Sequence, residues 1–365
     1  MKAVRPAAPH LAGLEPYDPT YLPARIYLNA NENPYGLPLE VRKELAEKLG
    51  MLGFHRYPSP LAAELRAALA QRDGVAEDCV LLGNGGDELL FDLMLAYGGP
   101  GRTLLTAPPT FSVYAADARL THTRVFEVPL MGDAAGAQAP LPWQIDEQAV
   151  LDAVRGGGID LVMLTSPNNP TGGCVRPGFL LELLAATDAL VVVDHAYLEF
   201  ANARFDMTQH LAAHDNLVIL RTFSKAYALA GVRLGYLLAS VPVVAELLKV
   251  RQPYSVDAFS ELAGLTVLAH HGQLHATVEA IVTERARLAN GLARIRSVLA
   301  YPSEANYVLT RVPGAHEVWQ RLYYDHGILV RDFSRAPLLE DCLRITVGTP
   351  QEDDALLAAL GQIVG

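Results

Sequence analysis

The hydrophobic positions of this sequence fall into short apolar runs that are separated by amphipathic stretches. Such runs predict buried strands, because a strand that helices cover on both faces of a sheet has no polar face. We expect strands at residues 80–82, 103–106, 161–164, 189–193, 217–220 and 235–239. Helical spacing predicts helices over residues 38–50, 61–73 and 177–187. Strands that alternate with helices in this way predict an α/β fold with a mostly parallel sheet and right-handed crossovers.

The pattern changes twice along the chain, and the changes predict its domain organisation. Residues 1–28 are rich in Pro and Tyr without periodicity, so we expect an arm that lies on a small domain or on a partner subunit. Residues 29–254 carry the strands described above and form the predicted large domain. Long helices over 257–298, followed by strand-like runs, predict a smaller α+β domain at 255–365.

Composition narrows the class of protein. Of 365 residues, 51% are hydrophobic and 19% are charged, which is typical of a folded globular protein. The net charge of −11 argues against a nucleic-acid partner, which needs a basic surface. Cys79, Cys174 and Cys342 lack the spacing of a zinc site or a disulfide framework and indicate a reducing compartment. With no apolar signal-peptide core and no run near the roughly 20 residues of a membrane span, we expect a cytoplasmic protein that does not enter the membrane.

Two further segments carry no predicted chemistry. His270, His271 and His275 lie on the polar face of a predicted helix without a carboxylate at ligand spacing, so we expect no metal site. Residues 131–143 are rich in Ala and Gly and predict a surface loop, to which we assign no function.

Three polar residues follow predicted parallel strands directly: Asn168, Asp194 and Lys225. Because the carboxyl ends of parallel strands meet at one edge of a sheet, we expect these side chains to converge. Taken singly, Asn168 and Asp194 are better explained as turn residues, and Lys225 as a solvated loop lysine. Their order along the chain is what favours a shared site.

The surroundings of Lys225 predict a phosphate site. Thr222 and Ser224 precede it and Arg233 follows it, and hydroxyls with a guanidinium suit the oxygens of a phosphate. A lysine beside such a site can form an imine with a phosphorylated aldehyde, which describes pyridoxal phosphate. Asp194 would then pair with the ring nitrogen of this cofactor and keep it protonated.

Further residues complete the predicted cofactor site. Asn168 and Tyr197 would hydrogen-bond the phenolic oxygen of the ring. A glycine-rich turn at 83–88 leads from a strand into a helix, which is a known anion cradle, and Gly86 and Asp87 lie in it. Asp87 has an alternative explanation as a helix N-cap residue.

These motifs resemble those of a known family. SPNNPTG at 166–172, DHAY at 194–197 and TFSK at 222–225, with Arg233 beyond it, are similar to the fold-type I, aspartate-aminotransferase-like enzymes. Five further segments resemble the histidinol-phosphate aminotransferase branch of this family: 28–32, 56–58, 303–307, 327–331 and 342–348. The resemblance covers nearly the whole chain. It implies a fold-type I pyridoxal-phosphate-dependent transferase, with a large domain built on the sheet and a smaller α+β domain.

The resemblance also implies roles for single residues. Gly86 and Asp87 match the cofactor-phosphate loop, and Phe111 takes the place of an aromatic residue, often Tyr, that stacks on the cofactor ring. Tyr57 matches a tyrosine that reaches the cofactor phosphate of the neighbouring subunit, which implies a homodimer. His195 departs from the family, which usually has Glu at this position.

Substrate contacts follow from the same resemblance. Tyr17 matches a substrate-contacting tyrosine on the amino-terminal arm, and Asn31 belongs to the matching segment 28–32. Arg344 matches the arginine that binds the carboxylate of glutamate or 2-oxoglutarate, and Arg331 matches one that serves the phosphate end of the substrate.

The expected activity is transamination of small molecules: histidinol phosphate and 2-oxoglutarate would be interconverted with imidazole-acetol phosphate and glutamate, in histidine biosynthesis. Two alternatives use the same scaffold, an aromatic-amino-acid aminotransferase for Phe or Tyr and a decarboxylase of a phosphorylated amino acid. A regulatory module that binds pyridoxal phosphate would need a fused DNA-binding segment, and the sequence has no helix-turn-helix pattern or basic extension.

Overall fold

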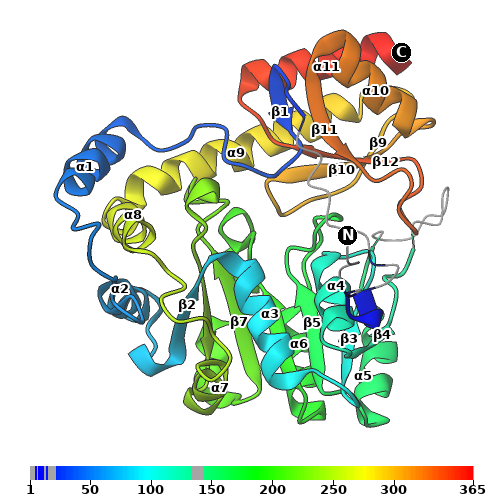
Figure 1. The fold of residues 1–365 in the computed structure, drawn as a ribbon. Coiled ribbons are helices and arrows are strands. Elements are labelled where there is room, and N and C mark those ends of the chain that lie inside the picture. Colours follow the sequence, from blue (N-terminus) through cyan, green and yellow to red (C-terminus); the bar gives the residue numbers. More distant parts are fainter. Residues whose placement is uncertain (1–4, 6, 12–13, 15–21, 133–142, 365) are drawn as a thin grey trace.

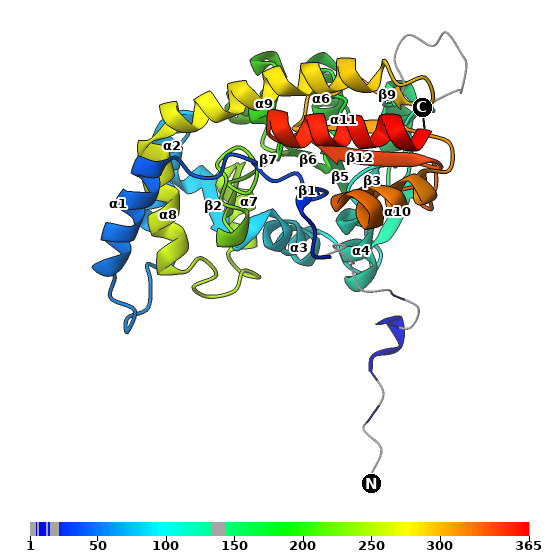
Figure 2. The same ribbon diagram turned by 90° about the horizontal axis from the view of Figure 1, so that it is seen from above.

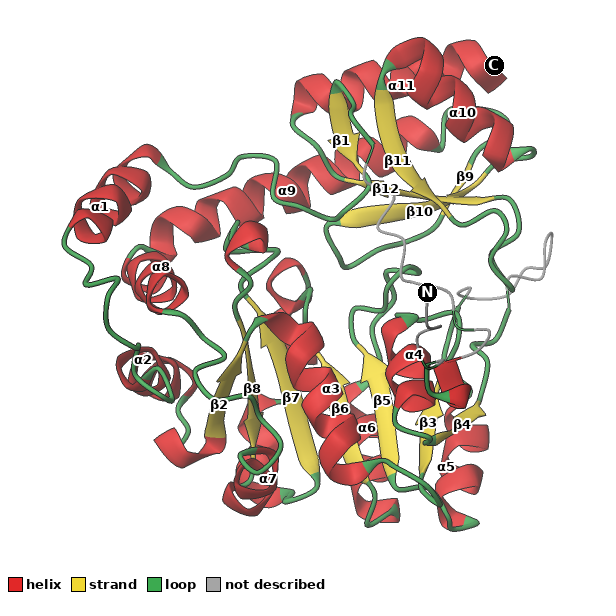
Figure 3. Cartoon of the chain, viewed as in Figure 1, coloured by secondary structure: helices red, strands yellow, loops and turns green. Residues whose placement is uncertain are grey.

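The computed structural model describes residues 5, 7–11, 14, 22–132 and 143–364. Tyr17, most of the predicted arm and residues 133–142 of the predicted loop therefore lie outside the described residues. Two sheets dominate the described part, and Figures 1 and 3 show the smaller sheet lying above the carboxyl ends of the larger one.

The larger sheet has seven strands in the order β2-β8-β7-β6-β5-β3-β4. Strand β8 runs antiparallel to both of its neighbours, whereas β4, β3, β5, β6 and β7 pair in parallel, so the mostly parallel sheet is confirmed. The strands are β2 (Val80–Gly83), β3 (Thr103–Thr106), β4 (Arg124–Glu127), β5 (Leu161–Thr165), β6 (Leu190–Asp194), β7 (Leu217–Thr222) and β8 (Gly235–Ala239).

Helices cover both faces of the larger sheet, and each face has its own core. On one face, strand residues pack against α3 (Gly85–Tyr97), α4 (Val113–Leu120) and α7 (Val241–Leu247). On the other face, they pack against α5 (Glu147–Arg155) and α6 (Pro177–Ala186). Every residue of β5, β6 and β7 is buried, which explains why these strands are apolar runs up to the polar residues at their carboxyl ends.

The smaller sheet has five strands in the order β1-β11-β12-β10-β9. The strands are β1 (Ile26–Leu28), β9 (Leu299–Ala300), β10 (Tyr307–Arg311), β11 (Ile328–Asp332) and β12 (Cys342–Thr346), with α10 (Ala315–His326) and α11 (Pro350–Val364) beside them. Strand β1 pairs in parallel with β11, and the other pairs are antiparallel. Residues 26–28, at the end of the predicted arm, form an edge strand of this sheet, and three residues are too few to show periodicity in the sequence.

The remaining helices are α1 (Leu39–Gly50), α2 (Ala63–Asp73), α8 (Ala258–Ala269) and α9 (His271–Leu292). Helix α8 packs against α1 and α2, and α9 extends from there to lie beside α11 (Figure 2). The domain boundaries at 28 and 254 remain a prediction. Short 3-10 helices occupy Pro9–Leu11, Glu77–Cys79, Leu198–Phe200, Ala203–Phe205, Thr208–Ala213 and Ala230–Val232. No helix of the described residues is long and apolar enough to cross a membrane.

Most predicted elements are confirmed with small shifts at their ends. The predicted helices correspond to α1, α2 and α6, and the long helices over 257–298 to α8 and α9. Elements α4, α5, α7, α10, α11, β4, β9 and β11 were not predicted from the sequence. The prediction that Trp143 lies in a surface loop was wrong: this side chain is buried, and its ring packs edge-on against Tyr301 at 5.9 Å.

A buried pair of carboxyl groups joins α9 to the first turn of α11. Asp353 is 0% exposed and Glu284 is 5% exposed. Asp353 accepts a hydrogen bond from the backbone N–H of Gly348 at 3.0 Å, and both oxygens of Glu284 accept from Arg287. Burial and the nearby Glu284 raise the pKa of Asp353 to about 8. Asp353 is therefore protonated in the folded protein at neutral pH, whereas it is ionised in the unfolded chain.

We expect Asp353→Asn to remove a pH-dependent loss of stability. The pKa of Asp353 is higher in the folded than in the unfolded protein. Its contribution to the stability of the fold is therefore fully present below about pH 4 and is lost as the pH rises towards 8. Asn keeps the acceptor for Gly348 but does not titrate. In urea denaturation, the free energy of unfolding of the variant, relative to that of the wild type, should rise by about 3 kcal/mol between pH 5 and pH 7.5. The exposed neighbour Asp354 supplies the control, and equal pH dependence of Asp353→Asn and the wild type would contradict the prediction.

Candidate active site

A cavity of about 280 Å³ opens at the carboxyl ends of β5, β6 and β7, beneath the smaller sheet. Thr165, Asp194 and Thr222 line it from the ends of these three strands, and Arg331 and Arg344 line it from β11 and β12. The parallel pairing brings the three strand ends to one edge, as the sequence analysis expected.

Most of the predicted site residues meet at this cavity. It is lined by Asn31, Gly86, Asp87, Phe111, Asp194, Tyr197, Thr222, Ser224, Lys225, Arg233, Arg331 and Arg344. Asn168 and Tyr57 are not among its lining residues. The cavity is also lined by residues that the sequence analysis missed: Asn29, Thr110, Asn169 and Phe333.

Lys225 lies just beyond the end of β7 with its amine inside the cavity region. Its Nζ donates a hydrogen bond to the backbone carbonyl of Ala30 at 2.8 Å. Burial and the positive charge of Arg344 lower the pKa of this amine to about 8. A substantial fraction of the amine is therefore unprotonated at mildly alkaline pH, which suits it to act as a nucleophile or base.

Asp194 ends β6 and is 4% exposed. One carboxylate oxygen, Oδ2, accepts from the hydroxyl of Tyr114 at 2.6 Å, and Oδ1 accepts from the backbone N–H of Ala196 at 3.0 Å. Burial raises the pKa of Asp194 to about 6, although the Tyr114 hydrogen bond opposes this. Neither donor carries a charge, so this buried carboxylate suits a cationic partner inside the cavity.

An anion cradle lines the cavity at the start of α3. The first backbone N–H groups of a helix have no partner within the helix and attract anions. Gly85 has a φ of +85°, and a Cβ at this position would lie 2.8 Å from a terminal nitrogen of Arg233. Arg233 pairs with Asp87 at 3.0 Å, and a Cβ on Gly235 would lie 2.7 Å from the backbone of Gly85. Glycine at 85 and 235 therefore allows β8, the helix start and Arg233 to approach closely.

Two hydroxyls complete this cradle. Thr222 donates to Ser224 Oγ at 3.0 Å, and the backbone N–H of Ser224 donates to Thr222 Oγ1 at 3.1 Å. Both residues are buried and line the cavity beside Lys225. The cavity thus offers a phosphate cradle, an amine and a buried carboxylate, which are the groups that pyridoxal phosphate requires, and the residues present fit this cofactor.

Asn168 does not face the cavity, unlike its sequence-based prediction. Its Nδ2 donates to the carbonyl of Pro109 at 2.9 Å and to Thr171 Oγ1 at 2.8 Å, and its Oδ1 accepts from Thr110 at 2.7 Å. The side chain is therefore used to hold the turn at the end of β5. The neighbouring Asn169 lines the cavity instead. Because the motif has two adjacent Asn residues, the sequence alone does not show which of them faces the cavity.

The segment 29–31 passes from the smaller sheet over the cavity and contacts its key side chains. Arg344 donates to the carbonyl of Asn29 at 2.6 Å and to Asn169 Oδ1 at 2.5 Å. Asn31 donates from Nδ2 to the Tyr197 hydroxyl at 3.0 Å. The sequence indicated the segment 28–32 through its resemblance to the family, but the position of this segment over the site depends on the pairing of β1 with β11.

Tyr57 lies on the surface, away from the cavity of its own chain. It is 82% exposed, and its ring stacks on Tyr254 at 4.7 Å. Met51 and Phe54 are also more than 70% exposed in the same connection between α1 and α2. Three large apolar side chains at such exposure form a surface that a binding partner would cover.

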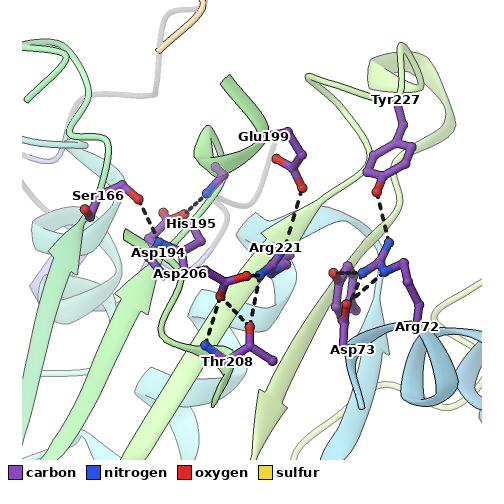
Figure 4. A network of polar contacts seen from close by, with 12 residues as sticks. Arg72, Asp73, Ser166, Asp194, His195, Glu199, Asp206, Thr208, Arg221 and Tyr227 are labelled. Carbon is purple, nitrogen blue, oxygen red and sulfur yellow. Dashed lines mark hydrogen bonds and ion pairs between the residues drawn. The ribbon is translucent and has the colours of Figure 1, made fainter. Parts of the chain in front are cut away.

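His195 lies on the other face of the sheet from Asp194, because successive side chains of a strand alternate. It is completely buried, and its Nδ1 donates to the Ser166 carbonyl at 2.7 Å (Figure 4). Burial and the nearby Arg221 lower the pKa of His195 to about 4, while Arg221 pairs with Asp206 at 2.8 Å. His195 is therefore neutral at physiological pH and adds no charge beside Asp194.

Comparisons with known proteins agree with this geometry. The family model described as aminotransferase class I and II matches residues 24–360. The chain is 44% identical over 355 residues to histidinol-phosphate aminotransferase 1 of Carboxydothermus hydrogenoformans, covering 97% of both chains. A crystal structure of histidinol-phosphate aminotransferase from Sinorhizobium meliloti in complex with pyridoxal-5'-phosphate matches with a TM-score of 0.88 and 26% identity, over 99% of this chain and 98% of that one.

A second similar structure has a different activity in its name. L-threonine-O-3-phosphate decarboxylase from Porphyromonas gingivalis matches with a TM-score of 0.80 and 25% identity, over 93% of this chain and 99% of that one. The family model nevertheless spans most of the chain, and the motifs that it matches surround the cavity described above. As its sequence motifs predicted, the chain belongs to the class I and II aminotransferase family.

Proposed function

We propose that this aminotransferase uses pyridoxal phosphate to interconvert histidinol phosphate and 2-oxoglutarate with imidazole-acetol phosphate and glutamate, as a step of histidine biosynthesis. The observation that carries the proposal is the presence of Arg331 and Arg344 in the same cavity as Lys225. Both substrates are anionic, and one site must accept a phosphate in one half-reaction and a carboxylate in the other. The relative from Carboxydothermus hydrogenoformans, 44% identical over nearly the full chain, bears the matching name. The cytoplasmic location stays a prediction.

When bound, pyridoxal phosphate withdraws electrons from the bonds of the substrate's α-carbon. Lys225 would hold the cofactor covalently and, once released by the amino donor, its Nζ would accept the proton of the α-carbon. The lowered pKa of this amine, about 8, supports its role as a base. Asp194 would keep the ring nitrogen of the cofactor protonated, and its burial strengthens that pairing.

The remaining residues would bind and orient the cofactor. Phosphate would lie at the start of α3, against Gly86, Asp87, Thr222, Ser224 and Arg233. Tyr197 would donate to the phenolic oxygen. We propose Asn169, rather than Asn168, as its second donor, because Asn169 lines the cavity while the Asn168 side chain is bonded elsewhere. Phe111 would stack on one face of the ring.

The two arginines divide the recognition of the substrates. Arg344 is 6% exposed and is held by Asn29 and Asn169, so its planar fork is fixed before a ligand arrives, which favours bidentate binding of a carboxylate. Arg331 lies over the ring of Phe333 at 5.8 Å and would bind the phosphate end of histidinol phosphate. Tyr17, outside the described residues, stays a predicted substrate contact.

A second candidate function is decarboxylation of a phosphorylated amino acid. The similarity to the Porphyromonas gingivalis decarboxylase supports it, because a phosphate-binding arginine would serve that substrate equally. Release of carbon dioxide would identify this activity directly. An aromatic-amino-acid aminotransferase is the third possibility that the sequence left open, and it would need no phosphate at the Arg331 end.

We further propose a homodimer in which Tyr57 reaches the cofactor phosphate of the partner subunit. The exposed apolar side chains of Met51, Phe54 and Tyr57 support this, because a second copy would cover them.

Replacing Lys225 by Ala should lower kcat by at least about a thousandfold, because it removes both the covalent link and the base. After borohydride reduction, mass spectrometry should find the cofactor attached to the peptide containing residue 225 in the wild type only. Lys249→Ala, at an exposed lysine paired with Glu246, is the matched control. Normal transamination by the Lys225→Ala variant would contradict the mechanism.

Replacing each of the two arginines should impair a different half-reaction. Arg331→Gln should lower kcat/KM for histidinol phosphate by about a hundredfold and affect glutamate much less, because a charge-assisted contact to phosphate is lost. Arg344→Gln should do the reverse. Single-turnover absorbance measurements without a keto acid check both variants. If phenylalanine reacts faster than histidinol phosphate with the wild type, the protein is an aromatic aminotransferase instead.

Mixed dimers test the shared site. Lys225→Ala and Tyr57→Ala subunits, each poorly active alone, should regain activity when mixed, to about a quarter of the wild-type value after random exchange. One site of each heterodimer then has both intact residues. If Tyr57 served its own chain, or if the protein were a monomer by sedimentation, mixing would restore nothing.

A further inference from the structure

The hydroxyl of Tyr114 lies directly against Asp194, in a place that no sequence motif indicated. Tyr114 lies in the first turn of α4, is 1% exposed, and packs its ring edge-on against Phe111 at 5.6 Å. Its hydroxyl oxygen is 2.6 Å from Asp194 Oδ2. A phenylalanine would fill the same space, so packing alone does not explain the hydroxyl.

The hydrogen-bond directions around this hydroxyl are fixed. An ionised carboxylate only accepts, so Tyr114 donates to Asp194. Thr165 Oγ1 lies 2.7 Å from the same hydroxyl and must then donate to it. A phenol that itself accepts a hydrogen bond is a stronger donor, so Thr165 reinforces the contact to Asp194. The chain of donors runs from Thr165 to Tyr114 to Asp194.

Other groups around Asp194 contribute less to its orientation. The Ala196 N–H binds the second carboxylate oxygen at 3.0 Å. Asp87, on α3, acts on it only through its negative charge and disfavours ionisation. His195 is neutral and lies on the opposite face of the sheet, and Lys225 donates to Ala30. Among the described residues, the side chain that donates a hydrogen bond to this carboxylate is thus that of Tyr114.

We propose that Tyr114 is a positioning residue: through the hydrogen bond that it donates to Asp194, it fixes the carboxylate towards the cofactor's ring nitrogen and favours its ionised form. The proposal rests on the proposed function, because it assumes that Asp194 faces the ring nitrogen. The lone pairs of Oδ2 that Tyr114 does not use are left for the cofactor. The high pKa of the buried Tyr114 phenol keeps its proton in place at every pH where the enzyme works.

Tyr114→Phe removes the hydroxyl while keeping the ring. Since a hydrogen bond that favours the ionised carboxylate is lost, the acid limb of the kcat/KM profile should move up by about one pH unit. The same shift should appear without turnover. Dialysis of the holoenzyme against buffers from pH 5 to pH 8 should show, by absorbance, that the variant releases pyridoxal phosphate at a pH about one unit higher than the wild type does.

Two further variants separate this effect from a loss of stability. Tyr236, on β8, is also 1% exposed, but its hydroxyl contacts Arg72 on the opposite face of the sheet from Tyr114. Tyr236→Phe should lower the melting temperature and leave both pH dependences unchanged. Thr165→Val removes the donor to Tyr114 and should shift the pH dependences of kcat/KM and of cofactor release in the same direction as Tyr114→Phe does, by a smaller amount. This variant tests the proposal even if Tyr114→Phe does not fold.

The outcomes are distinguishable. An active wild type with unshifted profiles in Tyr114→Phe and Thr165→Val would overturn the role of Tyr114 and leave the proposed function intact. Equal shifts in Tyr114→Phe and Tyr236→Phe would also overturn it, because the effect would then be one of general stability. A wild-type protein that binds no pyridoxal phosphate would overturn the proposed function and this inference together.

Discussion

The site depends on the parallel pairing of β5, β6 and β7. In this register Thr165 lies beside Asp194, and Asp194 lies beside Leu220, two residues before the end of β7. Strands that run in the same direction end at one edge, so residues separated by dozens of positions in sequence become neighbours there. A one-residue slip of β6 would turn Asp194 to the opposite face, where His195 now lies.

The smaller sheet contributes what the larger one lacks. The strand ends and the start of α3 supply an amine, a carboxylate and an anion cradle, but Arg331 and Arg344 come from β11 and β12. Strand β1 holds the start of the segment 29–31, which lies over Lys225 and contacts Arg344 and Tyr197. The groups proposed for catalysis at one sheet and those proposed for substrate recognition at the other are therefore joined through this short segment. Any relative motion of the two sheets would change both.

Buried charge in this acidic protein is balanced locally. Arg221 is bound by Asp206 and Thr208 on the face of the sheet opposite the cavity, and Arg72 binds Asp73 and the hydroxyl of Tyr227 nearby (Figure 4). Because these charges are paired on their own face, they do not neutralise Asp194. That carboxylate keeps only uncharged donors, and its pKa is raised by burial. The site thus retains one buried carboxylate whose charge is available to a ligand.

The sequence by itself determined the class of fold and most of the cofactor side of the cavity. Apolar runs predicted the buried strands, and the polar residues directly after them, such as Asp194 and Lys225, predicted the edge of the sheet where the cavity opens. Both patterns could be recognised because each depends only on residues that are adjacent in sequence. It did not distinguish Asn168 from Asn169, since adjacent identical residues differ only in the direction that the turn gives them. It did not find β1, Tyr114 or the buried Trp143 either. A three-residue strand, a helix residue that faces a distant carboxylate and the end of a low-complexity segment acquire their environment from residues far away in sequence, so only the tertiary structure decided them.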